Sequence, residues 1–360
     1  TQAKTLFPYT TLFRSLIKKF ALEPSQKSSK LLMTPTLKTS FTSYKPVALI
    51  SGPFFHHLDH LAPLCHFIGC PLLVDDKNTY LIGQKYYRDV DIQLVSIDLQ
   101  VLSEKYNLIL VSTKYAKEEL SNIYKSLNIN HMRFCFCPHG QSDKGVFDSN
   151  AISELGQDLV LFYGEHQKSR INPPDNYFIV GNFRLAYYQK FKQFYDEQIE
   201  TILTPLPKQK TILYAPTWKD QETSTTFFSF WKNIIQLLPD NYNLIVKIHP
   251  LLEKHYPAHT YEALSYNQFK PNILTLFEMP LIYPLLNKID VYLGDYSAIG
   301  YDFLYFNRPL FFLGNKKVPL YDCGIQVSSV EEFYQKIEET QDHLSGKRIE
   351  EYQYTFSPFL

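Results

Sequence analysis

The segment NKIDVYLGDYSAIGYDFLYFNRPLFFLG, residues 287–314, decides the fold class of this chain. Its apolar run at 291–293 predicts a buried strand, and the polar turn at 294–297 follows directly. The pattern then predicts a helix and a second strand over 310–313. A turn that leads straight into a helix presents unpaired backbone N–H groups, which suit a phosphate. The same residues also fit an ordinary βαβ unit in which Ser297 only caps the helix.

Two further segments predict strands that end in polar residues. They are KTILYAPTWKD, residues 210–220, and NLIVKIHP, residues 243–250. The polar residues at their ends are Thr217, Trp218, Lys219, Lys247 and His249. Ligands of open α/β sheets bind at the carboxyl ends of the strands. All three polar clusters are therefore expected at one binding edge.

These segments resemble the CDP-glycerol glycerophosphotransferases, a family that builds teichoic-acid-like polymers. The matching motifs, in the order of the family, are His139-Gly140, Pro216-Thr217-Trp218-Lys219, Lys247-Ile248-His249-Pro250, and Asp295-Tyr296-Ser297 with Tyr301-Asp302. The resemblance implies the architecture called GT-B, in which two Rossmann-like domains face a cleft. It also implies a transferase of the cell envelope that uses no cofactor.

The length and the strand pattern predict an α/β protein of two domains. A chain of 360 residues is too long for one comfortable core. Continuous apolar strands alternate with segments of helical length, including one helix over 184–203, which is typical of doubly wound parallel sheets. We expect an acceptor-side domain over 33–200 and a donor-binding domain over 201–345. The terminal segment 346–360 is expected to pack back on the N-terminal domain.

The first residues differ in composition from the remainder. Residues 1–46 hold eight basic side chains and one acid, Glu23, a balance that fits a targeting segment or an arm at a membrane surface. The stretch TLFPYTTLFRS, residues 5–15, resembles translated sequencing-adapter sequence. We therefore interpret residues 1–32 as a non-native or disordered leader, with Met33 as the natural start.

The overall composition excludes several classes of protein. Lys plus Arg equals Asp plus Glu at 36 each, which argues against a nucleic-acid partner. There is no apolar run of about 18 residues, so no membrane span is predicted. Five cysteines, an odd number, favour a reducing compartment such as the cytoplasm, with the inner face of the cell membrane as an alternative location. Cys135 and Cys137 alternate along an apolar strand without a second pair at ligand spacing, so no zinc site is expected there.

His139 is the predicted catalytic base. It follows an apolar strand and precedes Gly140, which would let a ligand approach the backbone. A histidine with a pKa near 6.5 can accept a proton from an alcohol at neutral pH. The resemblance assigns this role to the matching histidine. The family usually continues with threonine and proline, whereas Gln141 and Ser142 follow here, and a histidine at the start of a loop is the alternative.

A nucleotide diphosphate needs several charged or polar partners, because a helix terminus contributes only about 0.3 to 2 kcal/mol to anion binding. The expected donor-binding residues are Arg184, Thr217, Lys219, Lys247, His249, Asp295, Ser297 and Asp302, and His249 is also expected to take part in catalysis. Together they would hold the diphosphate without magnesium. The alternatives are solvent exposure for Lys247 and a surface carboxylate, instead of a ribose contact, for Asp302.

The segment HHLDHLAPLCHF carries four histidines, of which His56 and His60 share a helical face. We favour acceptor-side contacts for His56, His57 and His60 over a metal site, because no other ligand follows at recognisable spacing. Asp89-Val90-Asp91 mimics a two-acid metal motif, but so short a pattern is common by chance. No metal site is predicted.

The predicted reaction is attack of an acceptor hydroxyl on the β-phosphorus of CDP-glycerol or a related donor, with release of CMP. The acceptor would be a polyol or saccharide, free or lipid-linked, and the enzyme would associate peripherally with the membrane in the second case. A GT-B glycosyltransferase that uses a nucleotide-sugar is one alternative. A non-catalytic nucleotide-binding relative is another, since several motif positions are substituted.

Overall fold

The computed structural model describes residues 44–113, 116–141, 157–170, 177–219, 225–266, 270–277, 279–280, 282–314, 318–339 and 343–358. The expected leader, residues 1–32, lies outside them, and so does Ser142. Among the described residues, no helix is both long enough and apolar enough to cross a membrane.

The N-terminal half contains a sheet of seven parallel strands, in the order β3-β2-β1-β4-β5-β6-β7. The strands are β1 Pro46–Ile50, β2 Leu72–Val74, β3 Ile92–Leu94, β4 Leu108–Val111, β5 Arg133–Phe136, β6 Leu159–Phe162 and β7 Tyr177–Ile179. The helices are η2 Phe55–His57, α2 Leu58–Ile68, α3 Lys77–Tyr86, α4 Leu99–Lys105, α5 Ala116–Ser126 and α7 Glu165–Arg170.

The C-terminal half repeats this topology with six parallel strands, in the order β10-β9-β8-β11-β12-β13. The strands are β8 Lys210–Ala215, β9 Tyr242–Lys247, β10 Ile273–Leu276, β11 Val291–Gly294, β12 Leu310–Leu313 and β13 Ile325–Val327. The helices are α10 Phe227–Gln236, α11 Pro250–His255, α12 Pro257–Ser265, α13 Tyr283–Leu286, α14 Ala298–Phe303, η5 Leu304–Phe306, α15 Pro319–Asp322 and α16 Val330–Glu339. Both sheets follow the strand order typical of Rossmann-like domains, which confirms the predicted fold class.

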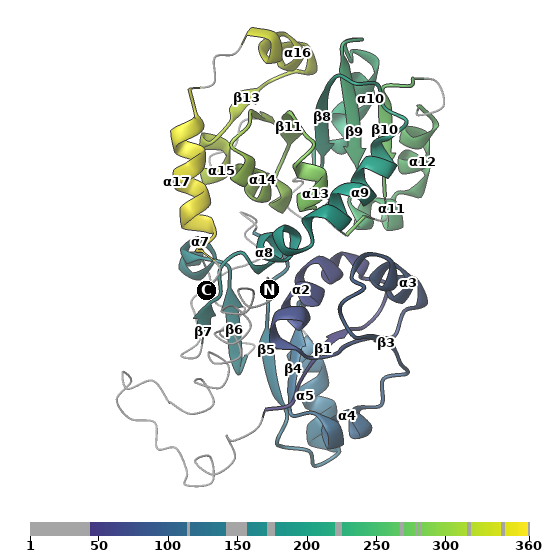
Figure 1. Ribbon diagram of the computed structural model, residues 1–360, viewed down its shortest axis with the longest axis vertical. Coiled ribbons are helices and arrows are strands. Elements are labelled where there is room, and N and C mark those ends of the chain that lie inside the picture. Colours follow the sequence, from purple (N-terminus) through teal and green to yellow (C-terminus); the bar gives the residue numbers. More distant parts are fainter. Residues whose placement is uncertain are drawn as a thin grey trace, which may run out of the picture.

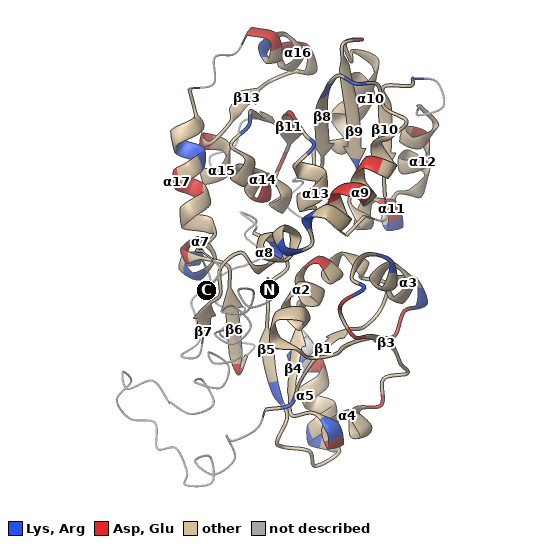
Figure 2. Cartoon of the chain, viewed as in Figure 1, with Lys and Arg blue, Asp and Glu red and all other residues tan. Residues whose placement is uncertain are grey.

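The strands are buried because their residues are apolar almost without interruption. Charged residues occur on the described strands only at their ends, where Arg133 and Lys210 begin strands and Lys247 ends one (Figure 2). Of these three residues, only Lys247 lies at the carboxyl end of its strand, which is the binding edge of the sheet. The segment 287–314 forms the predicted strand, turn, helix and strand, and β11 pairs with both β8 and β12 in the middle of the sheet.

Two helices, α8 Phe183–Lys190 and α9 Lys192–Leu203, connect the two sheets (Figure 1). The prediction of one helix over 184–203 was wrong, because the chain bends at Phe191, whose φ of −111° and ψ of 27° are not helical. The ring of Phe191 turns toward Tyr187, with ring centroids 4.9 Å apart. The predicted division of the chain near residue 200 remains a prediction.

The last helix, α17 Ser345–Thr355, runs from the C-terminal domain toward the N-terminal domain (Figure 1). Arg348 is buried and donates to the side chain of Asn307 in the C-terminal domain, at 2.9 Å. Beyond the helix, the N–H of Ser357 donates to the carbonyl oxygen of Tyr163 in the N-terminal domain, at 3.0 Å. The described chain therefore contacts both domains near its end.

Candidate active site

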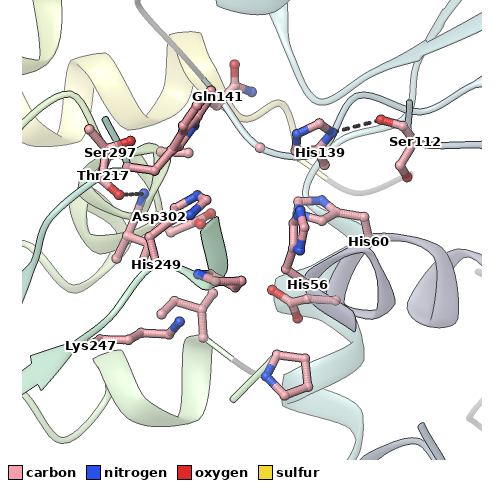
Figure 3. A pocket seen from close by; sticks show the side chains of 18 of the residues that line it. His56, His60, Ser112, His139, Gln141, Thr217, Lys247, His249, Ser297 and Asp302 are labelled. Carbon is pink, nitrogen blue, oxygen red and sulfur yellow. Dashed lines mark hydrogen bonds between the residues drawn. The ribbon is translucent and has the colours of Figure 1, made fainter. Parts of the chain in front are cut away.

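A cavity of about 410 Å³ lies between the two domains, at the carboxyl ends of both sheets. Residues that line it come after the strands on either side of the point where the strand order of each sheet reverses. Ligands of doubly wound sheets bind at this point. The predicted site residues that line it are His56, His60, His139, Gly140, Arg184, Thr217, Lys247, His249, Ser297 and Asp302. In Figure 3, the histidines of the N-terminal domain lie opposite Thr217, Lys247, His249 and Ser297 of the C-terminal domain.

His139 follows strand β5, and its backbone hydrogen bond fixes its tautomer. Its Nδ1 lies 2.7 Å from the carbonyl oxygen of Ser112, which follows the neighbouring strand β4 (Figure 3). A carbonyl oxygen can only accept, so Nδ1 carries the proton and the neutral ring keeps a lone pair on Nε2. The ring is exposed to the cavity, but the protein around it disfavours the imidazolium and lowers the pKa of His139 below 6.5.

Three more histidines of the N-terminal domain surround His139. The ring centroids of His56, His57 and His60 lie 5.9, 4.7 and 6.4 Å from that of His139. Burial lowers the pKa of His56 to about 3 and holds the pKa values of His57 and His60 well below 6.5. His60 also contacts the hydroxyl of Tyr163 through Nδ1, at 2.6 Å. The cluster is therefore uncharged at neutral pH.

His249 caps helix α11 and has the opposite tautomer. Its Nδ1 accepts a hydrogen bond from the backbone N–H of Leu251, at 3.1 Å. An Nδ1 that accepts is unprotonated, so the neutral ring carries its proton on Nε2. His249 therefore offers a donor from Nε2, whereas His139 offers an acceptor.

Lys247 brings a positive charge to the cavity from the end of β9. Its side chain is only 9% exposed, so the alternative of a solvated lysine does not hold. Burial lowers the pKa of Lys247 to about 8, although the nearby carboxylate of Asp59 acts in the opposite direction. Within the described part of the chain, the ammonium has no hydrogen bond or ion pair, which suits it to an incoming phosphate.

Arg184 forms a buried ion cluster with two carboxylates, one from each domain. Its guanidinium donates to Asp302 of α14 at 3.0 and 3.1 Å and to Asp59 of α2. Tyr283 donates to the same Asp302 through its hydroxyl, at 2.7 Å. Asp302 is 3% exposed and is therefore not a surface carboxylate. Arg184 borders the cavity, but its donors are already directed at protein carboxylates.

Asp295 is fully buried and holds a loop of its own domain. Its carboxylate accepts from the backbone N–H groups of Thr217 and Thr226, both at 2.9 Å, and from the Thr226 hydroxyl at 3.0 Å. Asp295 does not line the cavity, although Thr217 does. It thereby holds Thr217 at the wall.

Ser297 lies at the cavity and also caps α14, since its Oγ accepts from the backbone N–H of Ile299 at 3.4 Å. Gly140 lies directly opposite, in the N-terminal domain. It has a φ of +84°, and a Cβ built on it would lie 2.9 Å from the Cβ of Ala298. The two domains therefore approach each other closely beside the predicted base, where a residue larger than glycine does not fit.

Besides Asp295, two predicted site residues stand back from the cavity. His57 is 4% exposed and lies behind its wall. Lys219 is exposed, with its ammonium 5.9 Å from the ring centroid of Phe228. The sequence did not identify Ser112, whose carbonyl oxygen orients His139, or the pairing of Asp59 and Tyr283 with the Arg184 cluster. No sequence signal marks a backbone carbonyl, whereas a lone arginine on an apolar helix could have suggested a buried ion pair.

Two Rossmann-like domains that meet at such a cavity define the GT-B class of protein. Solved structures agree: the wall teichoic acid polymerase TagF matches with a TM-score of 0.57 and 14% identity, over 96% of this chain and 88% of that one. An S. aureus MnaA–UDP complex matches with a TM-score of 0.58 and 13% identity, over 88% of this chain and 92% of that one. At this identity, the likeness shows the fold.

Residues 180–323 match the model of the family described as CDP-Glycerol:Poly(glycerophosphate) glycerophosphotransferase. The resemblance recognised from the sequence motifs is thereby confirmed for this part of the chain.

Curated relatives agree with this family. The teichoic acid glycerol-phosphate primase of Bacillus subtilis (strain 168) is 24% identical over 127 residues, which cover 35% of this chain and 30% of that protein. The teichoic acid poly(glycerol phosphate) polymerase of Staphylococcus epidermidis (strain RP62A) is 28% identical over 144 residues, which cover 37% and 18%. The matched segments thus cover less than a third of each relative's length.

Proposed function

We propose that this protein transfers glycerol phosphate, or a related polyol phosphate, from a CDP-activated donor to a hydroxyl group of a cell-envelope polymer or glycolipid. The observation that carries the proposal is the pair of complementary tautomers in one cavity. His139 presents a bare Nε2 and His249 a protonated one, because their Nδ1 atoms meet a carbonyl oxygen and a backbone N–H respectively. Attack of a hydroxyl group on phosphorus needs one group that accepts the proton and donors that bind the phosphate oxygens.

In the proposed step, the acceptor hydroxyl gives its proton to Nε2 of His139 while its oxygen attacks the β-phosphorus. The bond from this phosphorus to the oxygen that bridges the two phosphates breaks, and CMP leaves with the electron pair. The product is a phosphodiester between acceptor and glycerol. Histidinium then returns its proton to solvent through the open cavity.

The C-terminal domain supplies the partners of the diphosphate in this proposal. The Nε2–H of His249 and the ammonium of Lys247 meet phosphate oxygens, and Thr217 and Ser297 border the same wall. Hydrogen bonds to a charged group contribute about 1.5 to 3 kcal/mol each, so two such donors exceed what a helix terminus provides. Lys219 and Asp295 contribute indirectly, through the loop after β8.

The N-terminal domain receives the acceptor, since His56, His60 and Gly140 line that side of the cavity. We place the reaction in the cytoplasm, at the membrane face if the acceptor is lipid-linked. The cysteines of the chain support a reducing compartment, because all five are free thiols and Cys65 and Cys70 remain unpaired with sulfur atoms 3.6 Å apart.

The test is CMP release from CDP-glycerol by the full chain, with a glycerol-phosphate-primed acceptor, followed by mass spectrometry of the product. We expect an added mass of glycerol phosphate and a rate about 10² to 10⁴ lower for His139→Gln. The matched control is His255→Gln, at an exposed histidine outside the cavity. Transfer of a sugar from a UDP-sugar instead, or tight CDP binding without turnover, would contradict the proposal.

A further inference from the structure

Three histidine side chains from two distant segments converge at one edge of the cavity. Each of His56, His57 and His139 offers a ring nitrogen, and these three atoms lie within 4.8 Å of one another. Residues 56 and 57 belong to η2, whereas residue 139 follows β5. Sequence spacing cannot reveal such a set, because the third ligand comes from more than 80 residues away.

The ring separations fit one small ion. Three imidazoles that bind zinc tetrahedrally at about 2.0 to 2.1 Å place their nitrogens roughly 3.4 Å apart and their ring centroids roughly 5 Å apart. Here the centroids are separated by 4.4 Å for His56 and His57, 4.7 Å for His57 and His139, and 5.9 Å for His56 and His139. The three observed separations lie on both sides of the value that one shared ion requires.

The surroundings of the rings also match a metal site. Ligating histidines usually donate their second nitrogen to a backbone carbonyl, which fixes the ring and makes it a better ligand. His139 does this through Ser112, at 2.7 Å, and keeps Nε2 for an ion. His56 carries a buried Nδ1 with no hydrogen-bond partner in the described part of the chain.

We propose that His56, His57 and His139 bind one Zn²⁺ or a similar divalent transition-metal ion. Three protein ligands leave the fourth tetrahedral position to water or an anion from the cavity. Imidazole nitrogens favour Zn²⁺, Co²⁺ or Cu²⁺ over Mg²⁺ or Ca²⁺, which prefer oxygen ligands. The ion would use the same Nε2 lone pair that the proposed transfer assigns to the base. Occupancy therefore blocks transfer, a consequence that rests on the proposed function.

Binding is tested without any activity assay. The full chain is titrated with CoCl2 and then with ZnSO4, and the visible ligand-field bands of tetrahedral Co²⁺ are recorded. We expect one ion per chain, displaced stoichiometrically by Zn²⁺. His56→Asn, His57→Asn and His139→Asn should each weaken Co²⁺ binding at least tenfold, the scale of losing a supporting contact at a metal site. The control His131→Asn lies outside the cavity and should bind like the parent.

X-ray absorption of the Zn²⁺-loaded parent keeps the test independent of how the variants fold. It should show three imidazole ligands. No tetrahedral Co²⁺ bands in the parent, or unchanged affinity in all three folded variants, would overturn the site. Zn²⁺ binding without loss of CMP release would leave the site intact and instead overturn His139 as the base.

Discussion

His139 presents a hydrogen-bond acceptor to the cavity, whereas His249 presents a hydrogen-bond donor. Both assignments hold for the neutral rings. Each follows from a backbone group at Nδ1, the Ser112 carbonyl oxygen at 2.7 Å and the Leu251 N–H at 3.1 Å. Both backbone groups belong to regular strand ends or helix caps, so the fold itself orients the two rings.

His249→Ala should weaken the binding of CDP by about 1 to 3 kcal/mol, the range for a lost hydrogen bond to a charged group. Cytidine, which lacks the diphosphate, should bind the variant and the parent equally. Calorimetric titration with both ligands measures the difference. His255→Ala, an exposed residue at the end of the same helix, is the control. Equal losses for CDP and cytidine would show that the variant had disturbed the nucleoside pocket instead.

The affinity for CDP should fall as the pH rises through about 8, where burial places the pKa of Lys247. The ammonium is protonated below this pH and attracts phosphate, whereas the neutral amine above it does not. The carboxylate of Asp59, which belongs to the other domain, disfavours the loss of the proton from Lys247. The loss of one charged partner corresponds to about a 10- to 100-fold decrease in affinity.

The measurement is a series of CDP titrations from about pH 7 to about pH 10, a range in which phosphate oxygens stay ionised. Lys247→Gln should bind weakly at every pH and show no such decline. A parent affinity that stays constant across this range would remove Lys247 from the phosphate site.

Gly140→Ala should lower both stability and activity. The residue has a φ of +84°, and the new Cβ would lie 2.9 Å from the Cβ of Ala298 across the domain interface. A backbone conformation that is unfavourable for alanine costs about 1 to 3 kcal/mol, and the contact would push the domains apart beside His139.

Gly346→Ala is the matched control, because Gly346 lies in α17 and a Cβ there would have no neighbour within 4 Å. Thermal unfolding of both variants tests this pair. A Gly140→Ala variant as stable and active as the parent would show that the two domains do not close this tightly in solution.

Arg184→Met should destabilise the fold by about 3 to 5 kcal/mol, because two buried carboxylates lose their partner. Asp59 and Asp302 are 5% and 3% exposed and could not be compensated by solvent. Denaturant unfolding gives the loss. CDP affinity per folded molecule should change less than in Lys247→Gln, since the guanidinium already faces protein carboxylates. A larger loss of CDP affinity in Arg184→Met than in Lys247→Gln would instead place Arg184 in the donor-binding site.

The sequence predicted the interior of the fold better than its edges. Continuous apolar runs identified β8, β9 and β11, which lie in the interior of their sheet. The edge strand β3, Ile92–Leu94, and the edge strand β13, Ile325–Val327, were not predicted. Each has three residues and a polar middle position, so neither has the pattern of a buried strand.

The functional site likewise contains residues that could be predicted from the sequence and contacts that could not. Residues at strand ends, such as His139 and Lys247, could be predicted because the position of a strand end follows from its sequence. The link between Asp59 and Arg184 could not, since the two residues are 125 positions apart and meet only in the folded chain. Whether a ring nitrogen donates or accepts also depends on which backbone group lies beside it, and the sequence does not show this.

The chain passes between the domains twice, once through α8 and α9 and once through α17 and the residues after it. Two fixed passages define a line, and relative movement of two rigid bodies held along a line is rotation about it. Arg184 lies in α8, at the first passage, so rotation about this line would displace the ion cluster less than it displaces groups far from the line.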